Sequence, residues 1–148
     1  MSTTMPAVRI LPMDSHLEFD GRSIEDVQQR FFLKELVGDG RPPGKYWYRA
    51  LGLKATSGTL VLFQYEGKLI ASAKLIDVER FKTAEKGTYN GALYFDVKSI
   101  RIFDPVGADV VSSVWPEVKR FSHVKWSLDP ERYAAFEQKF TGVEKPEQ

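Results

Sequence analysis

Two nearly continuous apolar segments, joined by the two-residue turn Glu66-Gly67, constrain the fold of this chain more than any other feature. Residues 59–65 and 68–78 are predicted to form a β-hairpin around this turn. Both segments are apolar at odd and at even positions for much of their length. Because successive strand residues point to opposite faces of a sheet, we expect both faces of the hairpin to be covered, as in a small barrel.

The remaining segments predict short strands with a few helices. Further strands are expected at residues 8–11, 92–97, 99–103 and 122–127, and helices at residues 24–36, at residues 108–115 and after residue 129. Ser23 is the predicted N-cap of the first helix, and Asp129 caps the last, in which Pro130 is the first helical residue. Residues 81–91 are polar and predict a loop. The predicted class is α+β: a small, mostly antiparallel, partly closed β-barrel of about six strands with two or three flanking helices.

Composition predicts a single domain spanning residues 1–148, partly irregular at residues 1–22 and 143–148. The net charge is only +1, from 21 basic and 20 acidic residues, which disfavours a sequence-independent nucleic-acid binder. No apolar run approaches the roughly 20 residues that span a bilayer, and no signal peptide is recognised. Since there is no cysteine, disulfides and thiolate zinc sites are excluded. We expect a cytoplasmic protein without membrane contact.

Catalytic residue types do not cluster in this sequence. Residues 66–68, EGK, match half of a nuclease carboxylate motif, but the motif needs a further acid, and a hairpin turn accounts for these residues. Two histidines are too few for a convincing triad or zinc site. Lys74, Tyr94 and Asp96 are the only residues from which a small hydrolase site can be assembled. We therefore predict no catalytic residues, no metal and no cofactor.

A group of rings beside a guanidinium is the best candidate for a ligand site. Trp47 and Tyr48 are followed by Arg49, and this combination suits a nucleobase, because rings stack on bases and arginine pairs with phosphate. Consecutive strand residues point to opposite faces, so Trp47 or Tyr48 must leave the core. Asp96 lies in an apolar segment, where its carboxylate needs a partner. That partner is either the exocyclic amine of a base or a structural group, such as the backbone or Arg101.

Several short segments together resemble the PUA-like superfamily, and in particular its EVE-type and ASCH-type domains. The segments are WYR at residues 47–49, GTLVLF at residues 58–63 and KLIASA at residues 68–73. The chain is closer still to the N-terminal base-binding module of EVE-HNH restriction endonucleases. That similarity adds YFD at residues 94–96, VWP at residues 114–116 and FSHVK at residues 121–125, in similar order. The resemblance covers residues from about 42 to about 140.

The resemblance implies a small β-barrel that takes up a modified cytosine, 5-methyl- or 5-hydroxymethylcytosine, flipped from DNA into an aromatic pocket. Carried over to this sequence, Trp47 and Tyr48 would form the pocket walls and Phe63 its floor. Asp96 would bind the Watson–Crick edge of the base, with Ser72 nearby.

Contacts to the nucleic-acid backbone are expected from basic residues along the chain. These residues are Arg49, Lys119, Arg120, His123 and Lys125. For His123, which alternates with Lys125 on one predicted strand face, a partly exposed strand histidine without a ligand role is the alternative. The chain departs from the restriction endonucleases in one respect, since two histidines cannot build an HNH nuclease. Either the chain is the base-binding part of a restriction system whose nuclease domain lies in cis or in trans, or it works alone.

Three other functions remain open at the level of sequence. The chain is equally compatible with an RNA-binding member of the same superfamily, and competition between RNA and methylated DNA would separate the two. A small hydrolase with an ASCH-like barrel is a second alternative. A protein-interaction module is a third, favoured by the near-zero net charge.

Overall fold

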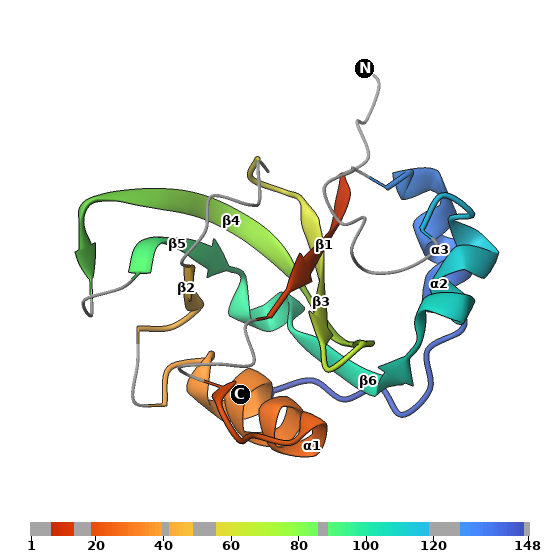
Figure 1. The fold of residues 1–148 in the computed structure, drawn as a ribbon, viewed down its shortest axis with the longest axis horizontal. Coiled ribbons are helices and arrows are strands. Elements are labelled where there is room, and N and C mark those ends of the chain that lie inside the picture. Colours follow the sequence, from red (N-terminus) through yellow and green to blue (C-terminus); the bar gives the residue numbers. More distant parts are fainter. Residues whose placement is uncertain are drawn as a thin grey trace.

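The computed structural model describes residues 7–13, 19–39, 42–48, 56–85, 89–118 and 128–146 (Figure 1). Its strands are β1 (Val8–Pro12), β2 (Lys45–Tyr48), β3 (Leu60–Tyr65), β4 (Lys68–Glu85), β5 (Tyr89–Phe95) and β6 (Arg101–Val106). Its helices are α1 (Ile24–Asp26), the π-helix η2 (Val27–Glu35), the 3-10 helix η3 (Val97–Ser99), α2 (Ala108–Val114), the 3-10 helix η5 (Pro130–Arg132) and α3 (Tyr133–Glu137). The predicted α+β class is confirmed. No helix in these described stretches is both long and apolar enough to cross a membrane.

The six strands form one sheet in the order β1-β3-β4-β5-β2, with β6 also paired to β4. β1 and β3 are parallel, and the other pairs are antiparallel, as predicted. β4 has 18 residues and appears as one long, bent strand (Figure 1). Its first part pairs with β3 and β6, whereas its second part, from Leu75 onwards, pairs with β5. Register shifts along β4 allow this bend, because a bulge adds local twist.

The β3–β4 hairpin forms around the predicted turn. Glu66 and Gly67 have φ angles of 52° and 77°, and a tight two-residue turn of this type requires positive φ at both positions. Both faces of the hairpin are covered, as its continuous apolar pattern predicts. Phe63 packs on one face and Leu62 on the other, and each belongs to a separate core cluster.

Helices cover the two faces of this part of the sheet. The first core cluster lies between the sheet and η2, and includes Phe31, Phe32, Tyr46, Phe63 and Phe95. The second core cluster lies between the opposite face and helices α2 and α3, and includes Leu62, Phe103, Trp115, Leu128 and Phe136. No described residue of β2 or β5 belongs to the second core cluster. The helices α2 and α3 therefore pack on one end of the sheet, away from β2 and β5 (Figure 1).

The described strands do not close into a barrel, in contrast to the predicted partial closure. In the strand order, β1 and β2 stand at the two ends, and no described pairing joins these two strands. Val8 of β1 forms one further antiparallel bridge, to Leu128. β1 has 5 residues and β2 has 4, so each end of the sheet is formed by a short strand. The fold is thus an open, strongly bent sheet with η2 on one face and with α2 and α3 on the opposite face at one end.

The predicted loop at residues 81–91 is wrong. β4 continues to Glu85, and β5 begins at Tyr89. Polar residues suit this part of β4 because it extends beyond the helices, with Lys82 and Thr83 exposed. Two further boundaries differ: β5 ends at Phe95, and η3 separates it from β6, which begins at Arg101.

The first helix begins where predicted but changes its geometry. The Ser23 hydroxyl accepts a hydrogen bond from the Asp26 amide at 3.0 Å, which confirms the cap. From Val27 onwards the helix is a π-helix, and the Leu36 amide donates to the Phe31 carbonyl at 2.7 Å, five residues back. The cap of the last helix is also confirmed, since Asp129 accepts from the Glu131 amide at 2.9 Å. The strand predicted at residues 122–127 lies outside the described residues.

Candidate functional site

Strand β2 places its two central rings on opposite faces of the sheet, as the alternation predicts. Tyr46 belongs to the first core cluster, and Tyr48 packs against that cluster from the same face. Lys45 and Trp47 point to the other face, and Trp47 belongs to neither core cluster. We call this side of β2, β5 and the second part of β4 the outer face. Trp47 is therefore the ring that lies on the face away from both core clusters, and its side chain is buried there.

The strand register assembles the outer face into two rows of three residues. The rows are Lys45, Tyr94 and Asp77, then Trp47, Ala92 and Glu79. Residues paired across neighbouring strands point to the same side, so all six share the outer face. Strands lie about 4.8 Å apart, which places the Cα atoms of Trp47 and Glu79 about 10 Å from each other, with Ala92 between them. The smallest side chain of the outer face thus separates an aromatic ring from a carboxylate.

The ammonium group of Lys45 lies over three of the rings. Its Nζ atom is 5.2 Å from the ring centroid of Trp47, 5.5 Å from that of Phe81 and 5.9 Å from that of Tyr94. The ring of Tyr89 adds a further contact to Trp47, with centroids 6.3 Å apart. Ring faces attract a cation because their π-electrons are negative. The outer face therefore presents electron-rich rings that already hold one positive charge.

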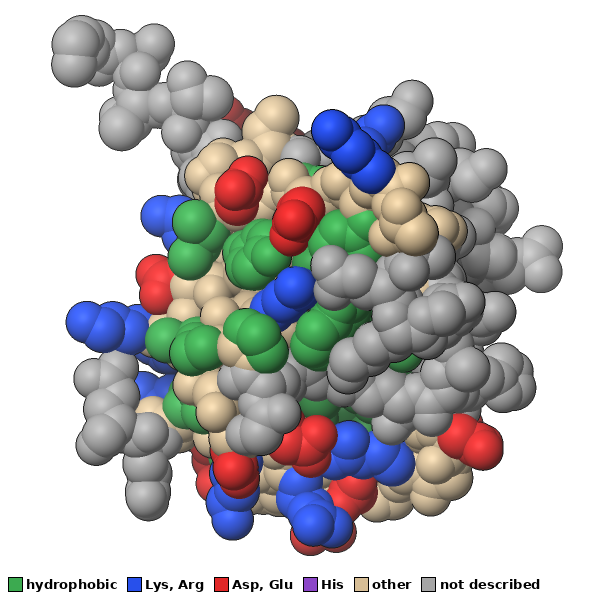
Figure 2. All heavy atoms as spheres, turned by 90° about the vertical axis from the view of Figure 1, so that its left-hand side faces the viewer, with side chains coloured by type: hydrophobic (Ala, Val, Ile, Leu, Met, Phe, Trp, Pro, Cys, Tyr) green, Lys and Arg blue, Asp and Glu red, His purple; other side chains and the backbone are tan. Residues whose placement is uncertain are grey.

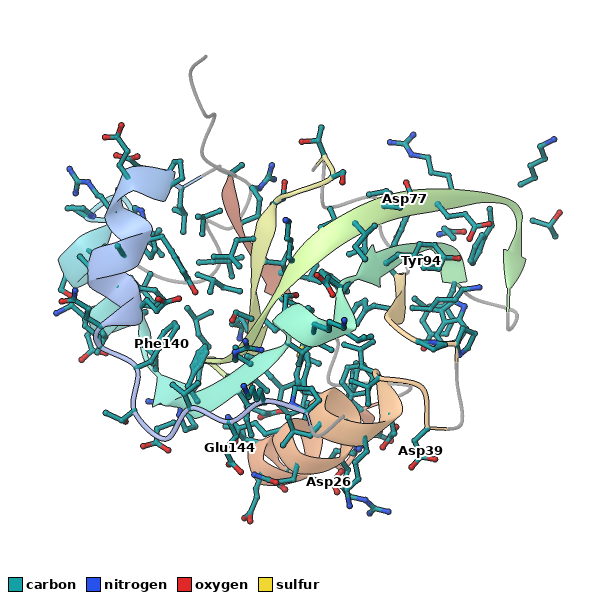
Figure 3. All side chains as sticks on the ribbon, turned by 180° about the vertical axis from the view of Figure 1, so that it is seen from behind. Asp26, Asp39, Asp77, Tyr94, Phe140 and Glu144 are labelled. Carbon is teal, nitrogen blue, oxygen red and sulfur yellow. The ribbon has the colours of Figure 1, made fainter. Side chains whose placement is uncertain are left out.

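Two carboxylates accompany these rings. The Tyr94 hydroxyl donates a hydrogen bond to Glu79 Oε1 at 2.5 Å, which orients that carboxylate on the outer face. An oxygen of Asp77 accepts a hydrogen bond from the Val78 amide at 2.8 Å. Figure 3 shows Asp77 and Tyr94 on neighbouring strands, at the end of the sheet away from α2 and α3. Carboxylates in such a place can accept hydrogen bonds from the amino group of a base.

The outer face is apolar at its centre and charged around it. Trp47 is 9% exposed and Ala92 is completely buried, although neither belongs to a core cluster. On the outer face, the Lys45 ammonium lies 5.2 Å from the centroid of the Trp47 ring. Ile76, beside Asp77 on β4, is 49% exposed. Figure 2 faces this end of the sheet and shows hydrophobic side chains gathered around a basic one, with acidic side chains at their edge.

Phe63, the predicted pocket floor, is a core residue. It is completely buried, and its ring centroid lies 4.8 Å from that of Phe32 and 5.1 Å from that of Phe95. The ring centroids of Phe63 and Tyr46 are 5.7 Å apart, on the face opposite to Trp47. The structure does not bring Phe63 and Trp47 together, because they lie on opposite sides of the sheet.

Tyr48, the second predicted pocket wall, lies on the core side of β2. Its hydroxyl donates a hydrogen bond to the backbone carbonyl of Glu79 at 3.3 Å, across β5. A side chain at Gly91 would collide with the Tyr48 hydroxyl, so the glycine leaves room for this ring to cross β5. Tyr48 thus braces the strands beneath the outer face.

Ser72 lies beneath helix α3. It is 4% exposed and pairs with Leu62, whose side chain belongs to the second core cluster. Tyr133 of α3 is the neighbour of its hydroxyl. Burial, and to a smaller extent the negative charge of Glu137, raises the pKa of Tyr133 to about 12, while a hydrogen bond with Ser72 acts in the opposite direction. Ser72 thus contacts Tyr133 of helix α3 and lies outside the two rows of the outer face.

Asp96 caps the 3-10 helix η3. Its Oδ1 atom accepts a hydrogen bond from the Lys98 amide at 3.0 Å, which matches the structural alternative of a bond to the backbone. Along the direction of β5 it lies four residues beyond Ala92, a separation of about 13 Å in an extended strand. Asp96 therefore lies past the end of the two rows that contain Trp47.

The residues predicted to contact the nucleic-acid backbone, Arg49, Lys119, Arg120, His123 and Lys125, lie outside the described residues. Sequence analysis missed Lys45, Glu79, Phe81 and Tyr89 as members of the ring group. An alternation at residues 77, 79 and 81 could have indicated Glu79 and Phe81, but the predicted strand ended at residue 78 and the predicted loop began at residue 81. Among the described residues, no group of histidine or acidic side chains is arranged to hold a metal ion. No protein-family model matches the chain, and a search of curated proteins found no similar sequence.

Proposed function

We propose that this domain recognises a modified base, 5-methyl- or 5-hydroxymethylcytosine flipped from DNA, and holds it against the rings of the outer face. The observation that supports this most is the group of rings around Lys45, with the carboxylate of Glu79 across Ala92. The rings provide stacking surface, and the carboxylate provides a polar contact to the edge of a base. The resemblance to the base-binding module of EVE-HNH restriction endonucleases supports the same function.

The cost of flipping a base and the energy gained by stacking it are of similar size. Flipping a base out of a duplex costs a few kcal/mol. Stacking on an aromatic side chain contributes about 1–3 kcal/mol per base, so one stacked base offsets most of that cost. Phosphate contacts supply the remaining affinity. The net charge of +1 keeps non-specific binding weak, which favours discrimination by the base.

Binding of a base requires Lys45 to leave the rings. A cation over a ring contributes about 0.5–1 kcal/mol at an exposed site and about 2 kcal/mol when desolvated. Stacking of a base is of equal or greater size. A base can therefore replace the ammonium group, and the released Lys45 remains beside the site as a positive charge.

The biological role that fits this activity is the specificity module of a modification-dependent restriction system in the cytoplasm. The domain recognises the modified site, and a nuclease in cis or in trans cuts the DNA. In this role the chain only recognises the modified base, and it carries out no catalytic step and uses no cofactor.

Fluorescence anisotropy at low salt tests the proposal with three duplexes of one sequence, containing cytosine, 5-methylcytosine or 5-hydroxymethylcytosine at one position. We expect one modified duplex to bind at least about tenfold more tightly than the unmodified one, a difference of about 1.4 kcal/mol. Equal binding of all three, or no binding, would contradict the proposal. An RNA of the same sequence serves as competitor, and its tighter binding would favour the RNA-binding alternative.

A further inference from the structure

We infer that Glu79 selects the base on the outer face, by accepting a hydrogen bond from an exocyclic amino group. The inference rests on the proposed function and specifies the class of ligand. That class comprises bases with an amino group on the Watson–Crick edge, such as cytosine and its 5-substituted forms, and disfavours thymine and uracil, which carry an acceptor at the 4-position.

The position of Glu79 within the rows is the first argument. Glu79 and Trp47 belong to the same row and lie on either side of Ala92. Ala92 is completely buried in the unbound protein, so a planar ring reaches this place only by displacing its present cover. Such a ring then has an aromatic surface on one side and a carboxylate on the other. The Lys45 ammonium, 5.2 Å from the Trp47 centroid, shows that this part of the outer face accommodates a positively charged hydrogen-bond donor.

The orientation of the carboxylate is the second argument. Glu79 Oε1 is held by the Tyr94 hydroxyl at 2.5 Å. A carboxylate has two oxygens with about four acceptor sites, so this single bond leaves most of its accepting capacity for a ligand. Tyr94 therefore fixes the direction of the Glu79 carboxylate and uses only part of its capacity to accept hydrogen bonds. A fixed acceptor discriminates better than a freely rotating one, because it cannot turn to suit a ligand with a different hydrogen-bonding pattern.

The chemistry of an ionised carboxylate supplies the selectivity. Such a group accepts hydrogen bonds and donates none. The N4 amino group of cytosine donates to it, whereas the O4 carbonyl of thymine is itself an acceptor. Glu79 is exposed in the unbound protein, and a base bound beside it would shield its carboxylate from water. Placing two acceptors face to face then leaves both unpaired, which is costly. Glu79 thus favours the amino base and disfavours the keto base.

The other two candidate carboxylates are engaged elsewhere. Asp96 caps η3 through the Lys98 amide at 3.0 Å. Asp77 accepts from the Val78 amide at 2.8 Å and belongs to the row of Lys45, not to the row of Trp47. Glu79 is therefore the described carboxylate that combines a side-chain orienting bond with a place opposite Trp47.

Single-stranded oligonucleotides with one central 5-methylcytosine or one central thymine provide the test. The two bases have the same ring and methyl group and differ at the 4-position and at N3, and a single strand removes the cost of flipping. We expect the wild-type protein to prefer 5-methylcytosine by about tenfold or more. In Glu79→Gln, whose amide both donates and accepts, the ratio of the two dissociation constants should fall towards one. Tyr94→Phe should lower the ratio partly, because the carboxylate loses its orienting bond.

Asp96→Asn is the matched control, since asparagine caps a helix as well as aspartate does. We expect it to keep the wild-type ratio. An unchanged ratio in Glu79→Gln, or a ratio lost in Asp96→Asn but not in Glu79→Gln, would overturn the inference. Equal binding of both oligonucleotides by the wild-type protein would overturn the inference while leaving base binding intact. No binding of either oligonucleotide would overturn the proposed function together with it.

Discussion

Replacing Lys45 by methionine should strengthen binding of an isolated nucleoside. The ammonium group lies 5.2–5.9 Å from three ring centroids, and a base that stacks there must displace it. Lys45 is half-buried, so the contact is worth about 1 kcal/mol, between the values for exposed and for desolvated pairs. Methionine keeps an unbranched apolar stem without the charge. The affinity for 5-methylcytidine should therefore rise about fivefold.

Isothermal titration calorimetry with the free nucleoside measures this change without any phosphate contact. Lys98→Met is the control, because Lys98 is an exposed lysine in η3, apart from the rings. The control should bind like the wild-type protein. Unchanged or weaker binding by Lys45→Met, with a retained melting temperature, would refute the reasoning, since the base would then not compete with the ammonium group.

Three other changes have defined expectations. Trp47→Ala should weaken binding of modified DNA by about 1–3 kcal/mol, measured by anisotropy well below its melting temperature, and unaltered binding would remove Trp47 from the site. Gln28→Leu should lower the urea-derived free energy of unfolding by about 1–3 kcal/mol, because the buried Gln28 amide donates to backbone carbonyls of β4 and β6 at 3.0 and 2.6 Å. The exposed Gln29→Leu should change it by less than about 0.5 kcal/mol, and similar effects at both positions would contradict this account. Burial raises the pKa of Tyr133 to about 12, so the folded protein favours the protonated form of this residue. Part of the free energy of unfolding should therefore be lost as pH rises from about 10 to about 12. Tyr133→Phe should lose less stability over this pH range than the wild-type protein. If both proteins unfold identically at alkaline pH, the contribution of Tyr133 is contradicted.

The hairpin at the centre of the fold could be predicted because its turn and its strands agree. Glu66-Gly67 favours a tight turn, and the flanking segments are apolar on both faces. The extension of β4 to Glu85 could not be predicted in the same way. Beyond the helices, this strand needs apolar residues on one face at most, and its exposed Lys82 and Thr83 are equally typical of a loop.

The candidate site was predictable only in part, because its geometry depends on strand register. Alternation along β2 predicted that Trp47 or Tyr48 leaves the core, and in the structure Trp47 lies outside both core clusters but is buried on the opposite face. The residues opposite it, Ala92 and Glu79, come from strands whose pairing includes a register shift between Leu75 and Asp77. A single sequence does not reveal such a bulge, and a one-residue shift exchanges the two faces of a strand. Phe63 was expected beside Trp47 because the family resemblance implied it, and the structure places it on the opposite face.

NMR spectroscopy of the wild-type protein during titration with 5-methylcytidine tests most directly whether the outer face binds a base. The account predicts saturable shifts of the Trp47 indole N–H and the Ala92 methyl group, because an aromatic base stacked over this row changes the local field at both. The Leu62 methyl groups, in the second core cluster, should remain unaffected. Saturable shifts confined to other residues, with Trp47 and Ala92 unchanged, would contradict the central claim that the base binds at the rings around Lys45.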